Sequence, residues 1–147
     1  MNRRRATGAQ GAVVVGALAI TVAVALPGGG VASASTRAVP RAMMGCWHRH
    51  APALPVGTAA GVWLMKITSA GKLAAYTPGT TSCGAYPDFT ATISVAGSHL
   101  TIGSVPVCGS KGVYTWKAAA NTLTLQATAD KSCSARTLLF TGVWKKT

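Results

Sequence analysis

The chain has 147 residues, 49% of them hydrophobic, and a formal net charge of +12. It has only two acidic residues, Asp88 and Asp130, against fourteen lysines and arginines. So few carboxylates argue against enzymes that need two acids, such as glycosidases. The basic residues are scattered and form no aromatic-rich basic motif, so we expect no nucleic-acid binding. The scattered charge predicts only weak attraction to anionic cell-envelope polymers.

The first 34 residues have the three parts of a secretory signal peptide. Arg3-Arg4-Arg5 precede an uncharged apolar stretch at residues 11–26, and Ala32-Ser33-Ala34 supplies the small residues of a cleavage site. The apolar stretch is shorter than the ~20 residues that span a bilayer as a helix. We therefore expect residues 1–34 to be cleaved, the product to be secreted, and no stable membrane insertion to remain.

Residues 35–42 predict a flexible leader, and residues 43–147 predict a single domain with all four cysteines. An even number of cysteines in an exported chain predicts disulfide bonds rather than free thiols. The sequence contains no close C-x-x-C pair, which argues against a zinc site. We expect no metal and no cofactor.

Short β-prone runs separated by Gly, Pro, Ser and Asn predict an all-β domain. Several runs alternate apolar and polar residues, as strands with one buried face do. No segment shows a helical period with caps. The short turns favour an antiparallel meander of about eight strands that closes into a small barrel, with a two-sheet β-sandwich as the alternative. The predicted strands are residues 43–48, 62–68, 72–76, 89–95, 99–103, 113–117, 122–128 and 136–145.

This strand layout favours one pairing of the cysteines. If residues 113–117 pair with residues 122–128, the far ends of the two strands meet. Cys108 lies just before the first of these strands and Cys133 just after the second. The layout thus favours Cys108–Cys133 and leaves Cys46–Cys83 by elimination, with Cys83–Cys108 as a competing pair.

Two motifs resemble a known family. Gly45-Cys46-Trp47 opens the first predicted strand with G-x-W, and Arg136 begins the last one. This pair resembles the lipocalins and their wider calycin-type barrel relatives. The resemblance implies that Trp47 closes one end of the barrel and that Arg136 packs across its ring as a structural plug, through cation–π attraction.

The last third of the chain resembles small secreted lipocalin-like proteins of high-GC Gram-positive bacteria more specifically. The residues that carry this resemblance are Gly112, Tyr114, Trp116, Leu123, Leu125, Asp130, Cys133, Arg136, Gly142 and Trp144.

The side chains with catalytic or metal-binding chemistry have simpler structural explanations. Asp88 fits a turn, and Asp130 fits a turn cap or a pair with Lys131 or Arg136. His48 and His50 project from one face of a strand, where surface histidines are the simpler interpretation. We therefore expect that the domain is not an enzyme.

Binding is the remaining class of function. We expect a secreted lipocalin-like protein that binds a small apolar or amphipathic ligand, although side chains that fill the barrel are an equally good interpretation. Tyr114 and Trp116 are the first candidates for the pocket wall, because each adds a polar group to an apolar surface. The alternative is a secreted protein-interaction module, such as a protease inhibitor or an envelope-associated factor, that uses residues 57–61 or 78–88.

The ligand-binding candidates are Tyr114, Trp116, Phe89, Leu125 and Phe140, and the other residues predicted to face the interior are Leu64, Tyr76, Ile93, Leu100 and Leu138.

Overall fold

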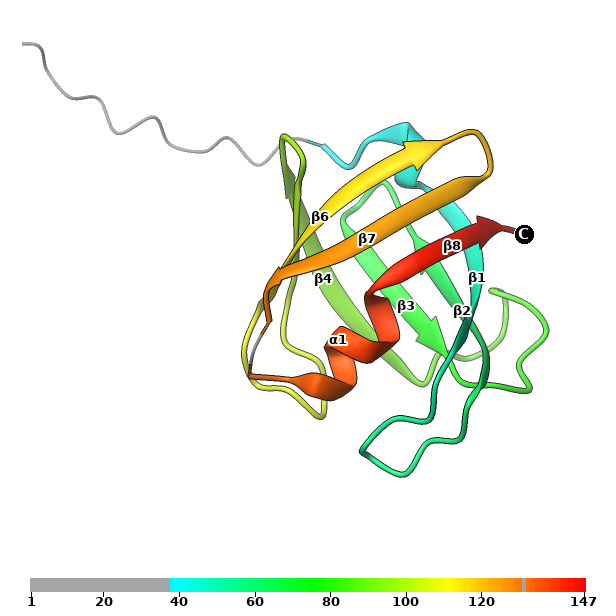
Figure 1. Ribbon diagram of the computed structural model, residues 1–147. Helices are drawn as coiled ribbons and strands as arrows, with labels where there is room; N and C mark the ends of the chain where they lie inside the picture. The colour runs from blue at the N-terminus through cyan, green and yellow to red at the C-terminus, as the bar shows by residue number, and fades with distance from the viewer. Residues whose placement is uncertain (1–37, 131) are drawn as a thin grey trace, which may run out of the picture. The chain divides into compact units, whose positions relative to one another are not determined.

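The computed structural model describes residues 38–130 and 132–147. The predicted signal peptide, residues 1–34, lies outside the described residues. The described chain forms a closed barrel of antiparallel strands, each paired with its neighbours in the sequence (Figure 1). This confirms the predicted barrel and excludes the two-sheet sandwich. The strands are β1 (Gly45–Ala51), β2 (Gly61–Ile67), β3 (Lys72–Tyr76), β4 (Phe89–Ala96), β5 (His99–Ile102), β6 (Gly112–Ala119), β7 (Thr122–Ala129) and β8 (Gly142–Lys146).

The barrel closes where β1 pairs with the last strand. β1 pairs along its whole length with β2 and, at Trp47 and His48, with β8. Closure thus pairs the two strands that would otherwise be the edges of the sheet. The alternation along β4 is as predicted, with Ala91, Ile93 and Val95 buried on the inner face.

The two ends of the barrel differ in how they are covered. The tight turns β2–β3, β4–β5 and β6–β7 lie at one end, together with the 3-10 helix η1 (Arg41–Met43). At this closed end Met43 is fully buried, and its carbonyl accepts a 2.9 Å hydrogen bond from Trp47 Nε1. The opposite end, the mouth, carries the longer connections 52–60, 77–88 and 103–111, together with the helix α1 (Ser134–Phe140).

The predicted strand 136–145 is wrong in its first half, where the chain forms α1. A local cap and a tertiary contact hold the two ends of this short helix. The Cys133 sulfur accepts a hydrogen bond from the Arg136 amide at 3.3 Å, and the Arg49 guanidinium donates to the carbonyls of Leu138 and Leu139. Helices this short are not stable on their own propensity, and so leave little periodic pattern in the sequence. One consequence is that Leu138, predicted to face the interior, is exposed.

The start of the domain also differs from the prediction. β1 begins at Gly45 rather than at residue 43, because residues 41–43 form η1. Val39 is buried in the core, so packed structure begins inside the predicted flexible leader. Residues 35–37 of that leader lie outside the described residues.

Two other predicted interior residues, Leu64 and Tyr76, are buried outside the barrel rather than within it. They pair across β2 and β3 on the face opposite to Trp63 and Met65. The Tyr76 hydroxyl donates a 2.8 Å hydrogen bond to the carbonyl of Cys83 in the 77–88 loop. This loop therefore covers the outer face of the sheet.

Both favoured disulfides are confirmed, and the competing Cys83–Cys108 pair is wrong. Cys46–Cys83 joins β1 to the 77–88 loop, with the two Cα atoms 6.0 Å apart. Cys108–Cys133 joins the 103–111 loop to the start of α1, with a Cα separation of 5.9 Å. Each bridge therefore fastens a mouth connection to a neighbouring element.

The expected packing of Arg136 on Trp47 is wrong. Trp47 is fully buried at the closed end, where the cation over its ring is Lys146, with Nζ 5.5 Å from the ring centroid. Arg136 belongs to α1 at the mouth instead. A different arginine, Arg49, lies 6.0 Å from the ring centroid of Trp144.

Candidate ligand-binding mouth

A cavity of about 210 Å³ lies at the mouth of the barrel. The 52–60 and 103–111 loops, the two ends of the 77–88 loop, the mouth ends of β2 and β4, and α1 form its walls. Val56 and Val107 carry apolar surface to the rim, with exposed fractions of 49% and 57%. The apolar lining residues are Leu54, Val56, Trp63, Phe89, Val105, Pro106, Val107, Ala135, Leu139 and Phe140, and the polar ones are Thr58, Thr77, Asp88 and Arg136.

The size of the cavity limits what it can hold. Pockets for drug-sized ligands measure ~300–1,000 Å³. The cavity at this mouth is smaller, so it suits a small molecule or one end of an elongated one. The apolar lining favours a hydrocarbon or aromatic group over a charged one.

Below the cavity, aromatic side chains fill the barrel. Phe140 lies at the centre of this cluster, with Phe89 and Tyr114 nearly perpendicular to it at centroid distances of 6.4 and 6.3 Å. Trp144 packs on another side of Phe140 at 6.4 Å. The edge-to-face contacts of Phe140 with Phe89 and Tyr114 add stability beyond the burial of apolar surface area. Phe89 and Phe140 therefore form the floor of the cavity, above a packed interior.

A buried ion pair supports the wall beside this floor. Arg136 donates to both carboxylate oxygens of Asp130, through Nε at 2.8 Å and Nη2 at 2.6 Å. The Tyr114 hydroxyl donates to the same carboxylate. Arg136 Nη1 donates to the carbonyls of Gly103 and Ser110. Every part of the pair is thus hydrogen-bonded, as buried charges require.

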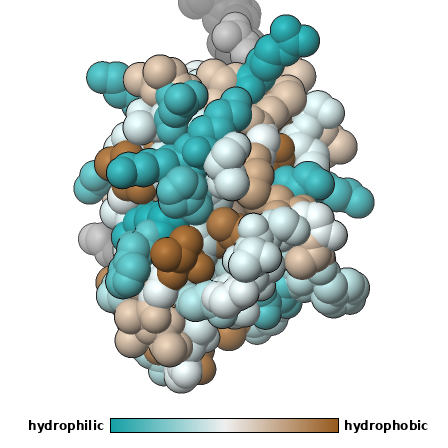
Figure 2. Space-filling view, turned by 90° about the vertical axis from the view of Figure 1, so that its right-hand side faces the viewer, coloured by the Kyte–Doolittle hydropathy of each residue, from teal (hydrophilic) through white to brown (hydrophobic). Residues whose placement is uncertain are grey.

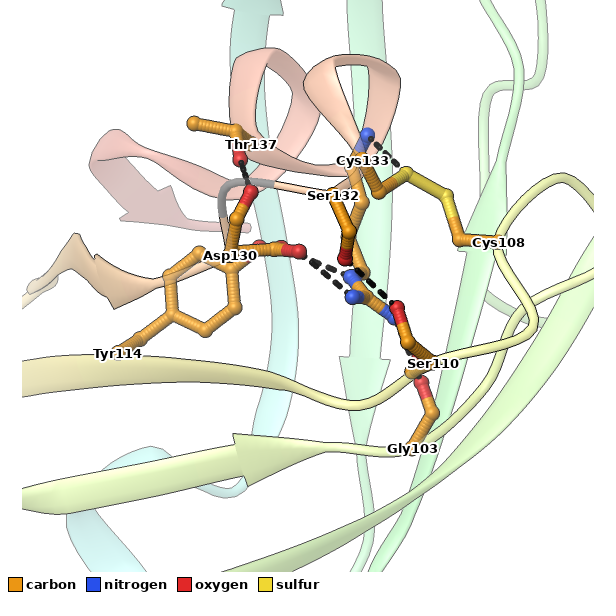
Figure 3. Close-up of a disulfide and its surroundings, with 9 residues drawn as sticks. Gly103, Cys108, Ser110, Tyr114, Asp130, Ser132, Cys133 and Thr137 are labelled. Carbon is orange, nitrogen blue, oxygen red and sulfur yellow. Dashed lines mark hydrogen bonds and ion pairs between the residues drawn. A yellow bond between two sulfur atoms is a disulfide. The ribbon is translucent and has the colours of Figure 1, made fainter.

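The ion pair joins three segments of the mouth. Figure 3 shows Asp130 between Tyr114 of β6 and Thr137 of α1, with the disulfide Cys108–Cys133 alongside. The Thr137 hydroxyl donates to the Asp130 carbonyl at 3.0 Å. β6, α1 and the 103–111 loop are therefore fixed relative to one another by a single network and one covalent bridge.

The network shifts the pKa values of its members. Burial acts to raise the pKa of Asp130, but the hydrogen bonds from Arg136 and Tyr114 outweigh it, and the pKa lies below its usual value. The hydrogen bonds with Asp130 raise the pKa of Arg136. Burial, together with the bond to Asp130, strongly raises the pKa of Tyr114. Asp130 and Arg136 therefore remain charged in the folded protein at neutral pH.

The structure separates the predicted ligand-binding residues into three groups. Phe89 and Phe140 line the cavity. Tyr114 and Leu125 are fully buried in the barrel below it and are not among the lining residues. Trp116 lies at the closed end, where its indole N–H donates to the Gly97 carbonyl at 3.0 Å. The cavity thus contains two of the five candidates.

Most of the cavity wall was missed by the sequence analysis. Leu54, Val105 and Val107 lie in loops, where no periodic pattern distinguishes an inward residue from an outward one. Trp63 could have been predicted to lie near the mouth, because it is close to the start of a strand that follows a long loop. Trp63 is 2% exposed, and its Nε1 has no hydrogen-bond partner among the described residues.

The described residues offer neither a metal-binding cluster nor a membrane-spanning helix. Residues 38–130 and 132–147 contain no group of three or more His, Cys, Asp or Glu side chains placed to hold a metal ion. The same part of the chain contains no helix long and apolar enough to cross a membrane. His48 and His50 lie on the outer face of β1, opposite Leu64 and Val62 of β2.

No family model, curated protein or solved structure matches this chain.

We predict that Gly112→Ala destabilises the protein by about 1–3 kcal/mol, the usual cost of overpacking. A Cβ at this position would lie 2.5 Å from Asp130 Oδ2 and 2.9 Å from Arg136 Nε, so neither side chain can yield without breaking the ion pair. Gly109→Ala is the matched control, because a Cβ there meets no atom within 4 Å. Urea unfolding measures both variants, and equal stability of the two would contradict the prediction.

The lowered pKa of Asp130 predicts how stability depends on acid. A carboxylate with a lowered folded-state pKa contributes its full stability above its unfolded value of ~3.9. That contribution is lost as the pH falls through the lower, folded value. The contribution of Asp130 should therefore fall away progressively as the pH drops from the unfolded value through the lower, folded one. Tyr114→Phe removes one of the bonds that lower this pKa, so the acid-dependent loss should be smaller and should be complete at a higher pH. Thermal unfolding measured between neutral pH and strong acid tests this prediction. An identical pH dependence of the unfolding temperature in wild type and variant would contradict the role of the Tyr114 bond in lowering the pKa of Asp130.

Proposed function

We propose that this domain is a secreted lipocalin-like protein that binds a small apolar or amphipathic molecule at the mouth of its barrel. The observation that carries the proposal is the apolar cavity between Trp63, Phe89 and Phe140, open at a rim that includes Val56 and Val107. Each Å² of apolar surface that a ligand buries there contributes about 25 cal/mol. The closed antiparallel barrel is compatible with this function.

An amphipathic ligand fits the lining better than a pure hydrocarbon. The Trp63 indole N–H is a buried donor with no acceptor among the described residues, and such groups are uncommon in native proteins. A ligand oxygen that reached this N–H would supply the missing acceptor. The Asp88 carboxylate at the cavity accepts hydrogen bonds from the amide and hydroxyl of Thr77.

We propose binding rather than catalysis for the mouth. Asp130, the buried acid nearest the cavity wall, has its carboxylate oxygens engaged by Arg136 and Tyr114. A general acid or base needs a proton that it can exchange near neutral pH. The two disulfide bonds are of the kind found in extracellular proteins and support secretion.

We predict that Val107→Trp weakens ligand binding by tenfold or more, about 1.4 kcal/mol, because the larger ring occupies the cavity. Val143→Trp is the matched control, since Val143 is 51% exposed, close to the 57% of Val107, and lies on β8 outside the cavity. Trp116→Ala is a second control at the closed end. The measurement is a calorimetric or dye-fluorescence titration with fatty acids, retinoids and apolar dyes.

The outcomes of that titration are distinct. Saturable binding that is lost in Val107→Trp and retained in both controls would support the mouth as the site. Trp63→Phe should then weaken the binding of ligands with an oxygen head group more than that of apolar dyes. A flat response across the whole panel would reject the ligand-binding proposal.

One observation favours the second candidate function, a protein-interaction module. Tyr86 is 95% exposed on the 77–88 loop. The Cys46–Cys83 bridge and the hydrogen bond from the Tyr76 hydroxyl to the Cys83 carbonyl fasten this loop to the barrel. Hydrogen bonds from Thr77 to the Asp88 carboxylate join the two ends of the loop. Exposed tyrosines on fixed loops are frequent hot spots of protein interfaces. Tyr86→Ser should abolish inhibition of a target protease if the domain is an inhibitor, whereas Val107→Trp should not affect it.

A further inference from the structure

Positive charge gathers at the closed end of the barrel. An antiparallel meander brings the end of one strand and the start of the next to the same level, so residues distant in sequence meet there. All the residues in this set have exposed side chains. They are Arg41 of η1, Lys66 near the end of β2, Lys72 at the start of β3, Lys117 near the end of β6, and Lys145 and Lys146 at the end of β8.

No side-chain carboxylate lies near these cations. The sequence has only two acidic residues, and both are at the mouth, where Asp88 immediately precedes β4 and Asp130 immediately follows β7. The single ion pair within residues 38–130 and 132–147 is Asp130–Arg136, which is fully buried. The charge of the closed end is therefore not neutralised by neighbouring side chains.

The basic surface continues from the closed end onto the outer face of the barrel. Lys145 pairs across the strands with His48, and Lys66 pairs with Cys46, two residues before His48 on the same strand. Figure 2 shows the face that lies on the right of Figure 1, with many of its hydrophilic residues in the upper part, toward the closed end. The cations are spread over several strands rather than gathered around one point.

We propose that the closed end is an anchoring surface for a linear phosphodiester polymer of the cell envelope. A polymer with regularly repeated charges can contact separated lysines simultaneously, and each contact releases counterions from the polymer. The proposal rests on the secretion included in the proposed function, but not on ligand binding at the mouth. A domain held in this way would have its mouth directed away from the polymer.

The aromatic residues of the closed end favour such a polymer over a single-stranded nucleic acid. Binding of single-stranded nucleic acids uses exposed aromatic rings on which bases stack. At this end Trp47 is fully buried and Trp116 is half-buried, with its N–H bonded to Gly97. The highly exposed Tyr86 is on the 77–88 loop, both ends of which are at the mouth. Recognition at the closed end therefore depends on charge, without a stacking surface.

The test measures binding of the exported protein to linear poly(glycerol phosphate) and to inorganic polyphosphate at several salt concentrations. Lys66→Gln combined with Lys145→Gln removes two charges from the closed end. Lys111→Glu lowers the net charge equally but lies in the 103–111 loop before β6, whereas Lys66 and Lys145 lie on β2 and β8 on either side of β1. We expect the double variant to bind about tenfold more weakly, and its slope of log K against log salt to fall by about 1.4, at ~0.7 per lost contact. Lys111→Glu should stay within about twofold of wild type.

Three results would overturn the proposal. Equal weakening by the two charge-matched variants would mean that net charge alone attracts the polymer. Absence of binding to either polymer at low salt would show that the closed end does not bind such polymers. Tighter binding of a single-stranded DNA with the same number of phosphates would identify a nucleic-acid site instead. Since the mouth titration uses different residues, its outcome separates failure of this proposal from failure of ligand binding.

Discussion

The ion pair between Asp130 and Arg136 connects segments of the mouth that the strand pairing alone leaves apart. Removing two charges from water costs several kcal/mol each, and the pair recovers this only if its geometry is good and all remaining donors are satisfied. Here two hydrogen bonds join the charged groups, and Tyr114 and two backbone carbonyls complete the set. Loss of one partner would leave the other buried and unpaired, so the arrangement of the mouth depends on both.

The cavity depends on this pair through α1. Ala135, Leu139 and Phe140 contribute to the cavity wall, and all three are on the helix that carries Arg136. The Cys133 sulfur and Arg49 hold the two ends of that helix. A seven-residue helix has little stability of its own, so the ion pair, the disulfide and the aromatic floor together determine its position.

The sequence predicted the barrel because its strands obey local rules. The alternation of Ala91, Ile93 and Val95 with polar residues shows directly which face is buried, and the short turns fix the order of pairing. The hairpin of β6 and β7 also located Cys108–Cys133. α1 and the cavity could not be predicted in the same way. The helix is stabilised by contacts distant in sequence, such as Arg49 with Leu138, and the lining loops have no periodic pattern. The position of Trp116 was predicted wrongly because the alternation of residues along β6 indicates which face of the strand Trp116 occupies, but not at which end of the barrel it lies.

The scarcity of acids gives the two ends of the barrel different properties. Asp130 is neutralised inside the mouth wall, and Asp88 is bonded to Thr77 at the rim. The mouth is therefore left with mainly apolar surface, which favours the burial of an uncharged group. The closed end keeps its lysines without carboxylate partners, and their field extends ~8 Å into solution at physiological salt. An apolar ligand and an anionic polymer would thus be attracted to opposite ends, so that occupancy of one need not obstruct the other.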